Sequence, residues 1–373
     1  MFLIGNPENR RVTMFQDALI QQGHPPATLV SYEDLLQDRG LLADVICPSM
    51  TVRIESPGEN FKVEREMLRL GFELAESENA ACINPLALDR LVEDYGRILY
   101  PRQWFLGFSQ LLRSLRDLTC RFMNAPDEIV CMFDKVETHR RCQAASIPVP
   151  PSLGPVQNFE ELLAFMDAAD WDRVFTKSAH SSSASCIGAF YRPKNGNMRL
   201  VTSTEMLHDS GELKLYNSLN IRTYTDASDI ALLVDEWCRH RVHVEKWLPK
   251  AGQDGYPCDL RIVVIGGEPA HAVVRLGLRS TITNLHLGNR RGDFKRLTET
   301  MGPEKLERVY ETCHKVARLF PGSHVIGVDL LFMPHFQHHY VLELNAFGDL
   351  LPNLDFRGYD TYGYEIAKWF SGD

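Results

Sequence analysis

Three residues with oxygen-bearing side chains lie close together near the C-terminal end of the 373-residue chain: Asp329, Glu343 and Asn345. Asp329 lies in an apolar run that predicts a strand, and Glu343 and Asn345 alternate with apolar residues in a second predicted strand. If the turn between the strands is centred on Phe336, Asp329 lies across from Glu343. Carboxylate and amide oxygens are ligands that Mg²⁺ takes, usually together with substrate phosphates. The spacing therefore predicts a magnesium site, although an amphipathic hairpin whose polar face meets water has the same pattern.

A second pair of predicted strands carries two arginines. The segment 259–275 consists of two apolar stretches around Gly266-Gly267-Glu268-Pro269, which is a strong hairpin signal. With the turn centred on Glu268, Arg261 and Arg275 oppose each other on one face. Two adjacent cations repel unless an anion lies between them, and a phosphate or an acyl phosphate would satisfy both. The alternative is that each arginine pairs with a surface carboxylate.

The composition is that of an ordinary soluble protein, with 44% apolar and 24% charged residues over a length that allows two or three domains. The net charge of −9 gives no electrostatic help to nucleic-acid or acidic-membrane binding, so we expect neither partner. No apolar run approaches a spanning helix, and the N-terminus lacks the pattern of a signal peptide. Nine cysteines without a Cys-x-x-Cys pair fit reduced thiols, so we expect a cytoplasmic protein.

The N-terminal third alternates predicted strands and helices: a strand over 2–5, a helix over 10–22 and a strand over 27–32. This order predicts a parallel α/β sheet, and the absence of Gly-x-Gly-x-x-Gly after the first strand gives no support to a dinucleotide site. The segment 53–60 has two open interpretations. Its polar residues can hold a substrate at a strand end, or it is a turn that leads to Asn60 as the N-cap of the next helix.

The middle of the chain places lysines beside segments that can surround phosphates. We expect a helix over 127–145, which carries Lys135 and ends before Ile147-Pro148-Val149-Pro150. Lys177 ends a predicted strand and precedes a loop of small residues at 178–185, whose backbone N–H groups can approach phosphate oxygens. The plain alternatives are a solvated helix lysine and a surface hairpin.

The order and spacing of these short motifs resemble those of the ATP-grasp ligases over roughly residues 125–370. Asp134-Lys135, Thr138 and the proline segment 147–150 are similar to the start of that family's nucleotide-binding region, and Asp329 with Glu343-x-Asn345 is similar to its metal site. The resemblance implies an α/β fold of the α+β ATP-grasp type. It also implies three parts: an N-terminal parallel α/β domain over 1–124, a lid subdomain over 125–244 and a C-terminal subdomain with the metal site over 245–373.

The resemblance also implies roles for individual residues. The ATP-binding residues would be Lys135, Lys177, Ser181, Ser182, Ser183, Glu245, Lys246, Leu248 and Asp259. Of these, the two lysines would contact phosphates, and Glu245 with the backbone of Lys246 and Leu248 would contact adenine. Arg275, Arg261 and Asn284 would act on the transferring phosphoryl group. Asp329, Glu343 and Asn345 would bind two Mg²⁺ ions, with Mn²⁺ as an alternative.

The segment Asn284-Leu285-His286-Leu287-Gly288-Asn289 is similar to an Asn-Leu-x-x-Gly-Gly stretch of glutathione synthetases and of the ligase that adds glutamate to a ribosomal protein. The last glycine of that stretch is Asn289 here, so we expect the loop geometry to differ.

The activity that the resemblance implies is the ATP-dependent joining of a carboxylate and an amine through an acyl phosphate, with release of ADP and phosphate. Two other classes stay open, a small-molecule kinase and an ATP-binding regulatory module without turnover. The substrates would be small-molecule or peptide carboxylates and amines, and the acceptor is open between a free, a peptidic and a protein-bound amine. Many similar proteins are dimers or tetramers, so a homodimer is the expected oligomer.

Overall fold

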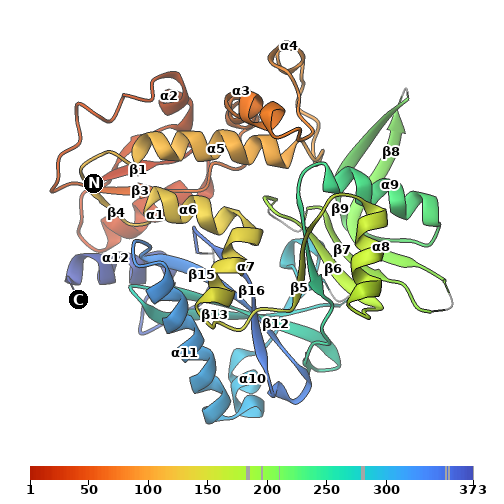
Figure 1. The fold of residues 1–373 in the computed structure, drawn as a ribbon. Coiled ribbons are helices and arrows are strands. Elements are labelled where there is room, and N and C mark those ends of the chain that lie inside the picture. Colours follow the sequence, from red (N-terminus) through yellow and green to blue (C-terminus); the bar gives the residue numbers. More distant parts are fainter. Residues whose placement is uncertain are drawn as a thin grey trace.

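The computed structural model describes residues 1–181, 185–194, 196–209, 211–278, 282–348, 351 and 353–372. Three sheets organise the chain, and Figure 1 shows them at the upper left, at the right and in the lower centre. This arrangement confirms the predicted fold class, a parallel α/β unit followed by a two-lobed α+β module. The domain boundaries stay predictions. Among the helices of the described ranges, none is both long and apolar enough for a membrane span.

The N-terminal unit contains β1 (Phe2–Ile4), α1 (Arg10–Gln21), β2 (Thr28–Val30), α2 (Tyr32–Gln37), β3 (Thr51–Ile54), α3 (Phe61–Ser77), α4 (Pro85–Leu88), α5 (Pro101–Leu115) and β4 (Arg121–Phe122). Its sheet is parallel, in the order β2-β1-β3-β4. Asn60 caps α3 with its side chain, as predicted. Helices α3 and α5 pack closely at Gly71 and Gly107. The contact requires glycine, because a Cβ at Gly107 would lie 1.9 Å from the carbonyl oxygen of Met67.

The second unit contains α6 (Pro126–Phe133), α7 (Lys135–Ala144), β5 (Ser152–Val156), α8 (Phe159–Ala168), β6 (Arg173–Ser178), β7 (Ile187–Tyr191), β8 (Arg199–Asp209), β9 (Glu212–Tyr224), α9 (Ala227–Cys238) and β10 (Val242–Lys246). Its sheet is antiparallel, in the order β5-β10-β6-β7-β8-β9. Helices α8 and α9 contribute Leu162 and Trp237 to its core, where both side chains are fully buried. The strand, loop and strand predicted around the serine-rich segment are β6 and β7.

The third unit contains β11 (Gly252–Gln253), β12 (Tyr256–Ile265), β13 (Glu268–Leu276), the 3₁₀ turn η1 (Leu285–Leu287), β14 (Arg290–Arg291), α10 (Phe294–Met301), α11 (Pro303–Leu319), β15 (Val325–Phe332), η2 (Pro334–Phe336), β16 (His339–Asn345) and α12 (Thr361–Ser371). Its sheet runs β14-β13-β12-β15-β16, with β11 paired to β12. The β12–β13 turn is Gly266-Gly267, and both glycines have the positive φ that tight hairpin turns require.

The helix expected over 127–145 is two helices, so that prediction was wrong in detail. Asp134 lies between α6 and α7 in an extended conformation, and its side chain accepts two backbone N–H bonds from the first turn of α7. An aspartate competes with helix continuation in this way because its short side chain reaches nearby backbone donors. Lys135 is therefore the first residue of α7, and its own N–H donates to the carbonyl oxygen of Ala179 at 3.0 Å. This hydrogen bond connects the first residue of α7 to the loop after β6.

Helix α12 joins the two ends of the chain through a buried ion network that contains two residues of the segment 53–60. The Arg53 guanidinium is 2.5 Å from Glu55 on one side and 2.6 Å from Glu365 of α12 on the other, and all three residues are buried. The same guanidinium stacks over the ring of Phe15 at 4.1 Å. Of the two interpretations of this segment, the turn and the N-cap are observed. Arg53 forms ion pairs with Glu55 and with Glu365 of α12.

Candidate active site

The β15–β16 hairpin places the three predicted metal ligands side by side. Asp329 is paired with Glu343 and Gly327 with Asn345, which confirms the predicted register of Asp329 across from Glu343. Asp329 is buried, and Glu343 and Asn345 are half-buried. The amide nitrogen of Asn345 is 3.5 Å from the Gly327 carbonyl oxygen, which leaves its side-chain oxygen as a donor atom for a ligand.

The predicted opposition of Arg261 and Arg275 is wrong. Arg275 is paired with Asp259, and Arg261 with Val273. The sequence-based register centred the turn on Glu268, whereas Gly266 and Gly267 form it. A bulge between Ile262 and Val264 then shifts the pairing by one residue, back toward the predicted register.

Both arginines nevertheless meet at one carboxylate, that of Asp329. Arg261 donates to it through Nε at 2.6 Å and Nη2 at 2.7 Å, and Nη2 of Arg275 lies 3.1 Å away. The anion expected between the two cations is thus a protein side chain. The two arginines outweigh the effect of burial and lower the pKa of Asp329, so it is ionised at neutral pH.

The same row of charges continues to Asp259 on β12. Its carboxylate accepts from Nε of Arg275 at 2.6 Å and from Lys250 at 3.2 Å, and the Thr283 hydroxyl donates to it as well. Lys250 also lies 2.9 Å from the Thr283 oxygen. Burial opposes ionisation, but the two cations lower the pKa of Asp259. The sequence analysis missed Lys250 and Thr283, since each is a single residue outside any motif and reaches Asp259 only through the tertiary fold.

Lys135 extends the charged row toward α7. Its ammonium is 3.1 Å from Glu343, and it donates to the Ser181 carbonyl at 2.6 Å. The Ser181 hydroxyl donates to the carbonyl oxygen of Ser185. Ser182 and Ser183 lie outside the described residues.

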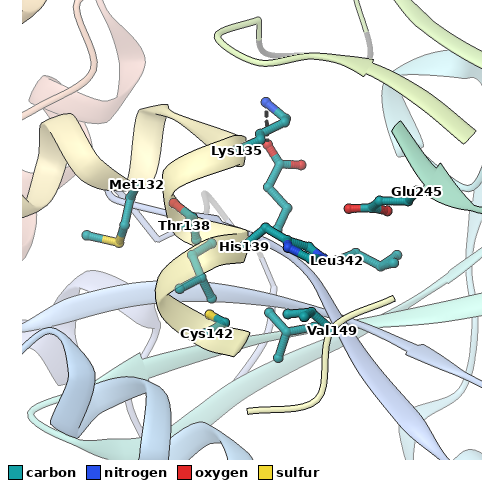
Figure 2. Close-up of a pocket in the computed structure, with 11 residues that line it drawn as sticks. Met132, Lys135, Thr138, His139, Cys142, Val149, Glu245 and Leu342 are labelled. Atoms are coloured by element: carbon teal, nitrogen blue, oxygen red, sulfur yellow. Dashed lines mark ion pairs between the residues drawn. The ribbon is translucent and has the colours of Figure 1, made fainter. Parts of the chain in front are cut away.

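A pocket opens beside Lys135, between α7, β10 and β16 (Figure 2). Its wall is mostly apolar and includes five charged or polar residues. The lining residues are Met132, Lys135, Thr138, His139, Cys142, Val149, Glu245, Val341, Leu342, Glu343 and Leu344. An apolar slot with a small number of polar groups is the usual form of a small-molecule site.

Lys177 and Glu245 face each other at the edge of this pocket. The ammonium lies 2.7 Å from Oε2 of Glu245 and donates to the Leu342 carbonyl at 3.1 Å. Burial works against the charged carboxylate, but Lys177 and His243 outweigh it and lower the pKa of Glu245 to about 2. Glu245 is therefore an ionised acceptor at any physiological pH.

The other two predicted adenine contacts are Lys246 and Leu248. The backbone N–H of Lys246 donates to the Pro151 carbonyl at 2.8 Å, so its backbone can offer a ligand only the carbonyl oxygen. The Lys246 ammonium lies over the ring of Trp171. Leu248 follows the end of β10 and is half-buried.

Two histidines adjoin Glu245 and were missed by the sequence analysis. His243 precedes Glu245 by two residues on β10, a spacing that puts both side chains on one face of the strand. Its Nε2 is 3.4 Å from Oε1 of Glu245. His139 lies one turn after Lys135 on α7, and burial lowers its pKa. The strand spacing was a readable signal, but nothing in the sequence places His139 beside it.

The loop that carries Asn284 is held by Asn289, the residue that replaces the last glycine of the Asn-Leu-x-x-Gly-Gly stretch. The Asn289 amide donates to the carbonyl oxygens of Ile282 and Asn284, at 2.7 and 2.9 Å, and accepts from the N–H of Leu278 at 3.0 Å. The Asn289 side chain thus stabilises this loop through hydrogen bonds that a glycine could not make. Asn284 is half-buried at this loop's start.

The fold is that of the ATP-grasp ligases. The structure is similar to that of the macrocyclase MdnC bound with precursor peptide MdnA from Microcystis aeruginosa MRC, with a TM-score of 0.55 and 12% identity over 100% of this chain and 99% of that chain. It is also similar to the ATP-grasp ligase PsnB complexed with precursor peptide PsnA2 and AMPPNP, with a TM-score of 0.52 and 16% identity over 98% and 96% of the two chains.

The D-cycloserine synthetase DcsG gives a TM-score of 0.51 at 12% identity, over 98% of each chain. No family model matches the chain, and no curated protein sequence does. At these identities the similarity establishes the fold, and the function rests on the site.

Proposed function

We propose that this chain is an ATP-dependent carboxylate–amine ligase that acts through an acyl phosphate and releases ADP and phosphate. The observation that carries the proposal is the convergence of the charged row with the pocket. Asp259, Arg275, Asp329, Arg261, Glu343 and Lys135 form one chain of ion pairs and paired strand positions that leads to the pocket rim. Such a row is suited to phosphates and to charge that develops during phosphoryl transfer.

The pocket is the proposed adenine site. Its apolar wall, which includes Cys142, Val149 and Val341, would take the base, and Glu245 would accept from the amino group. The carbonyl oxygen of Lys246 and the N–H of Leu248 are the backbone groups left for the base edge. The ammonium groups of Lys135 and Lys177 form ion pairs with Glu343 and Glu245, and a triphosphate would give both a more highly charged partner.

Magnesium fits the residues of the β15–β16 hairpin. Two carboxylates and an amide oxygen on directly paired strands are hard oxygen donors of the kind that Mg²⁺ prefers, and Asp329, Glu343 and Asn345 would hold it. When bound, Mg²⁺ would offset the negative charge on the phosphates of ATP. Mn²⁺ takes the same kinds of ligand.

The residues of the chain would position the substrates and neutralise the charge of the transferring phosphoryl group. A substrate carboxylate oxygen forms a bond to the γ-phosphorus while the bond from that phosphorus to the β-phosphate oxygen breaks, which gives an acyl phosphate and ADP. The amine nitrogen then attacks the acyl carbon, loses a proton and displaces phosphate. Arg275 and Arg261 would hold the transferring phosphoryl oxygens, and Asn284 would contact them from its loop. The loop after Lys177 would exclude water, which otherwise hydrolyses the acyl phosphate. Ser182 and Ser183 stay predicted contacts of this loop.

The proposed substrates are peptides or small molecules that carry a carboxylate and an amine. Two of the structurally similar proteins are bound with precursor peptides, and a third is a D-cycloserine synthetase. These support the class of substrate.

The test is incubation of the purified chain with ATP, Mg²⁺ and pools of amino acids and short peptides, followed by measurement of ADP and mass spectrometry of the products. We expect substrate-dependent ADP with an amide product. ADP with a phosphorylated product would instead identify a kinase. Nucleotide binding without ADP under any condition would contradict turnover and leave a regulatory module. The Asp329→Asn variant is the matched inactive control.

A further inference from the structure

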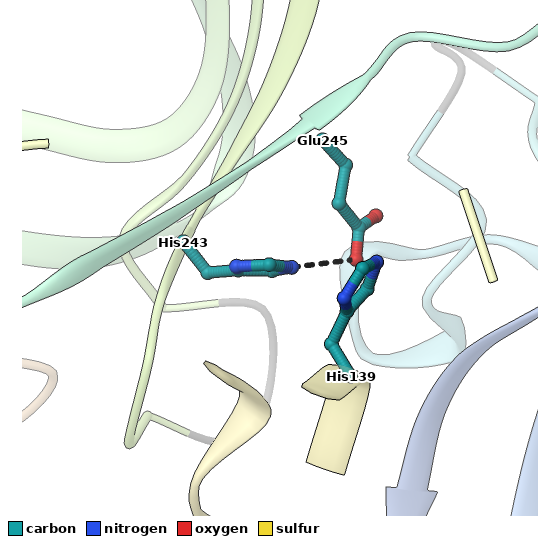
Figure 3. A group of neighbouring side chains, drawn as sticks. All are labelled: His139, His243 and Glu245. Atoms are coloured by element: carbon teal, nitrogen blue, oxygen red, sulfur yellow. Dashed lines mark ion pairs between the residues drawn. The ribbon is translucent and has the colours of Figure 1, made fainter. Parts of the chain in front are cut away.

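His139, His243 and Glu245 form a compact group that the proposed ligase chemistry does not use as a group. One nitrogen from each histidine and one carboxylate oxygen all lie within 4.8 Å of one another. Figure 3 shows the two rings and the carboxylate converging from α7 and β10. His243 and Glu245 are buried, and His139 is half-buried.

The hydrogen bonding of His139 suits a metal ligand. Nε2 of His139 is 2.8 Å from the Pro150 carbonyl oxygen. A carbonyl only accepts, so this contact places the proton on Nε2 and leaves the lone pair on Nδ1. Metal-binding histidines commonly have such a backbone carbonyl behind them, because it fixes the tautomer and the ring orientation.

His243 provides a second, independent observation. Its side chain is 2% exposed, and within the described part of the chain neither of its ring nitrogens makes a hydrogen bond of normal geometry. The 3.4 Å approach of its Nε2 to Glu245 is too long for a strong bond. Buried polar atoms without a partner are costly and uncommon in native proteins. An ion between the imidazole and the carboxylate would satisfy the buried nitrogen.

Glu245 can serve such an ion with one oxygen. Lys177 contacts Oε2, whereas Oε1 is the oxygen that faces His243. Two neutral imidazoles and one carboxylate are a donor set that Zn²⁺ and neighbouring transition metals accept, with a position left open for water or another ligand. Bonds of about 2.0–2.2 Å would require the side chains to close by roughly an ångström or less.

We propose that His139, His243 and Glu245 form a site for a divalent transition-metal ion, and that its occupation excludes adenine from the neighbouring pocket. The exclusion follows from shared residues, because His139 and Glu245 also line the pocket. This second part rests on the proposed function, in which Glu245 accepts from adenine. Imidazole ligands favour a transition metal over Mg²⁺, so this site is separate in place and chemistry from the β15–β16 carboxylates.

The experiment has two arms on the full chain. In the first, Zn²⁺ is titrated against a chromophoric chelator, and Co²⁺ is added to follow the visible absorption of a tetrahedral site. The variants are His139→Gln and His243→Gln. The matched control is His338→Gln, which removes an exposed histidine from the β15–β16 turn. Thermal melting checks that each variant folds, and His139→Gln tests the site if the more deeply buried His243→Gln does not.

We expect tight binding of a single Zn²⁺ ion and a tetrahedral Co²⁺ spectrum in the wild type and the control. Affinity should drop at least about tenfold in each folded site variant, in line with the loss of a metal ligand or its support. Equal Zn²⁺ affinity in wild type and site variants would overturn the metal site.

The second arm measures AMPPNP binding with Mg²⁺ at increasing Zn²⁺. We expect the apparent Kd for AMPPNP to rise with Zn²⁺ in the wild type and to stay constant in His139→Gln. A Zn²⁺-independent Kd in a wild type that binds Zn²⁺ at this site would overturn the exclusion. If AMPPNP fails to bind even without Zn²⁺, the ligase proposal fails, whereas the first arm still decides the metal site.

Discussion

Two buried ion networks in this molecule have opposite construction. The N-terminal network has one cation between two carboxylates, Arg53 between Glu55 and Glu365. The C-terminal network has an excess of cations, with Arg261, Arg275 and Lys250 on two carboxylates, Asp329 and Asp259. The first joins α12 to the N-terminal sheet. The second continues by strand pairing to Glu343 at a pocket.

The difference distinguishes a structural network from a functional one. The network of one arginine and two acids is closed, because both carboxylates are paired with Arg53 and, in the described part of the chain, none of the three residues lines the pocket beside Lys135. Three cations on two acids leave cationic charge that an anionic substrate can share. Burial and ion pairing alone therefore do not identify the active site, but excess charge beside a pocket does.

The largest expected effect is on turnover, from Asp329→Asn. The change removes a predicted metal ligand and the carboxylate that orients both arginines, so we expect ADP formation to fall by about 10²–10³-fold or more. Coupled-enzyme detection of ADP measures it, with circular dichroism as the check on folding. Retention of more than a tenth of the wild-type rate would place the chemistry elsewhere.

The corresponding change in the other network should act on stability. Arg53→Met leaves two buried carboxylates without a counterion, so we expect the free energy of unfolding to fall by about 3–5 kcal/mol. Urea denaturation measures this. At a temperature where the variant is folded, its turnover should stay within a few-fold of wild type, and a loss comparable to that of Asp329→Asn would erase the distinction between the networks.

Loss of the Lys177 ammonium should weaken nucleotide binding. Lys177→Met removes a charge-assisted partner of the proposed phosphates, which typically contributes about 1.5–3 kcal/mol. We expect the Kd for AMPPNP with Mg²⁺ to rise by one to two orders of magnitude, roughly, as the same energy implies. Lys246→Met is the matched control, because Lys246 is on β10, which pairs with the strand of Lys177, and its ammonium lies over the ring of Trp171. An equal loss in both variants would contradict the assignment.

The N-terminal network should also show a pH dependence. Burial raises the pKa of Glu365 from its ordinary 4.5 to about 7, with Arg53 opposing and Glu55 adding to the shift. The folded state therefore holds this proton more tightly than the unfolded state, and the contribution to stability is full below pH 4.5 and is lost as pH rises through about 7. We expect Glu365→Gln to flatten the fall in stability over that range. An unchanged pH profile would argue against the shift.

The smallest effect is expected at Asn289. Asn289→Gly introduces the last glycine of the Asn-Leu-x-x-Gly-Gly stretch but removes three side-chain hydrogen bonds in the loop of Asn284. Each is typically worth about 0.5–1.5 kcal/mol, and glycine adds backbone freedom, so we expect a few-fold loss of turnover with little change in global stability. Higher turnover than wild type would mean that the side chain restrains the loop unproductively.

The sequence predicted those parts of the fold in which pattern and spacing are local. The β15–β16 register followed from alternation and turn length, so Asp329 and Glu343 were placed correctly. The β12–β13 register failed because the turn was centred on Glu268, whereas the preceding pair Gly266-Gly267 forms it. The break at Asp134 was hidden in a continuous helical pattern, and the capping role of that residue was the overlooked signal. Lys250, Thr283 and His139 reach the site only through long-range packing, which no local pattern encodes.

The most direct measurement is calorimetric titration of AMPPNP into wild-type protein and Glu343→Gln, each with and without Mg²⁺. Glu343 lies across from Asp329 in the β15–β16 hairpin and forms an ion pair with Lys135, so it joins the charged row to the pocket. We predict that the wild type binds AMPPNP tightly only with Mg²⁺, and that Glu343→Gln loses most of this Mg²⁺ dependence. Equal affinity of the wild type with and without Mg²⁺, or an unaltered Mg²⁺ dependence in Glu343→Gln, would contradict the assignment of this row as the site of phosphoryl transfer.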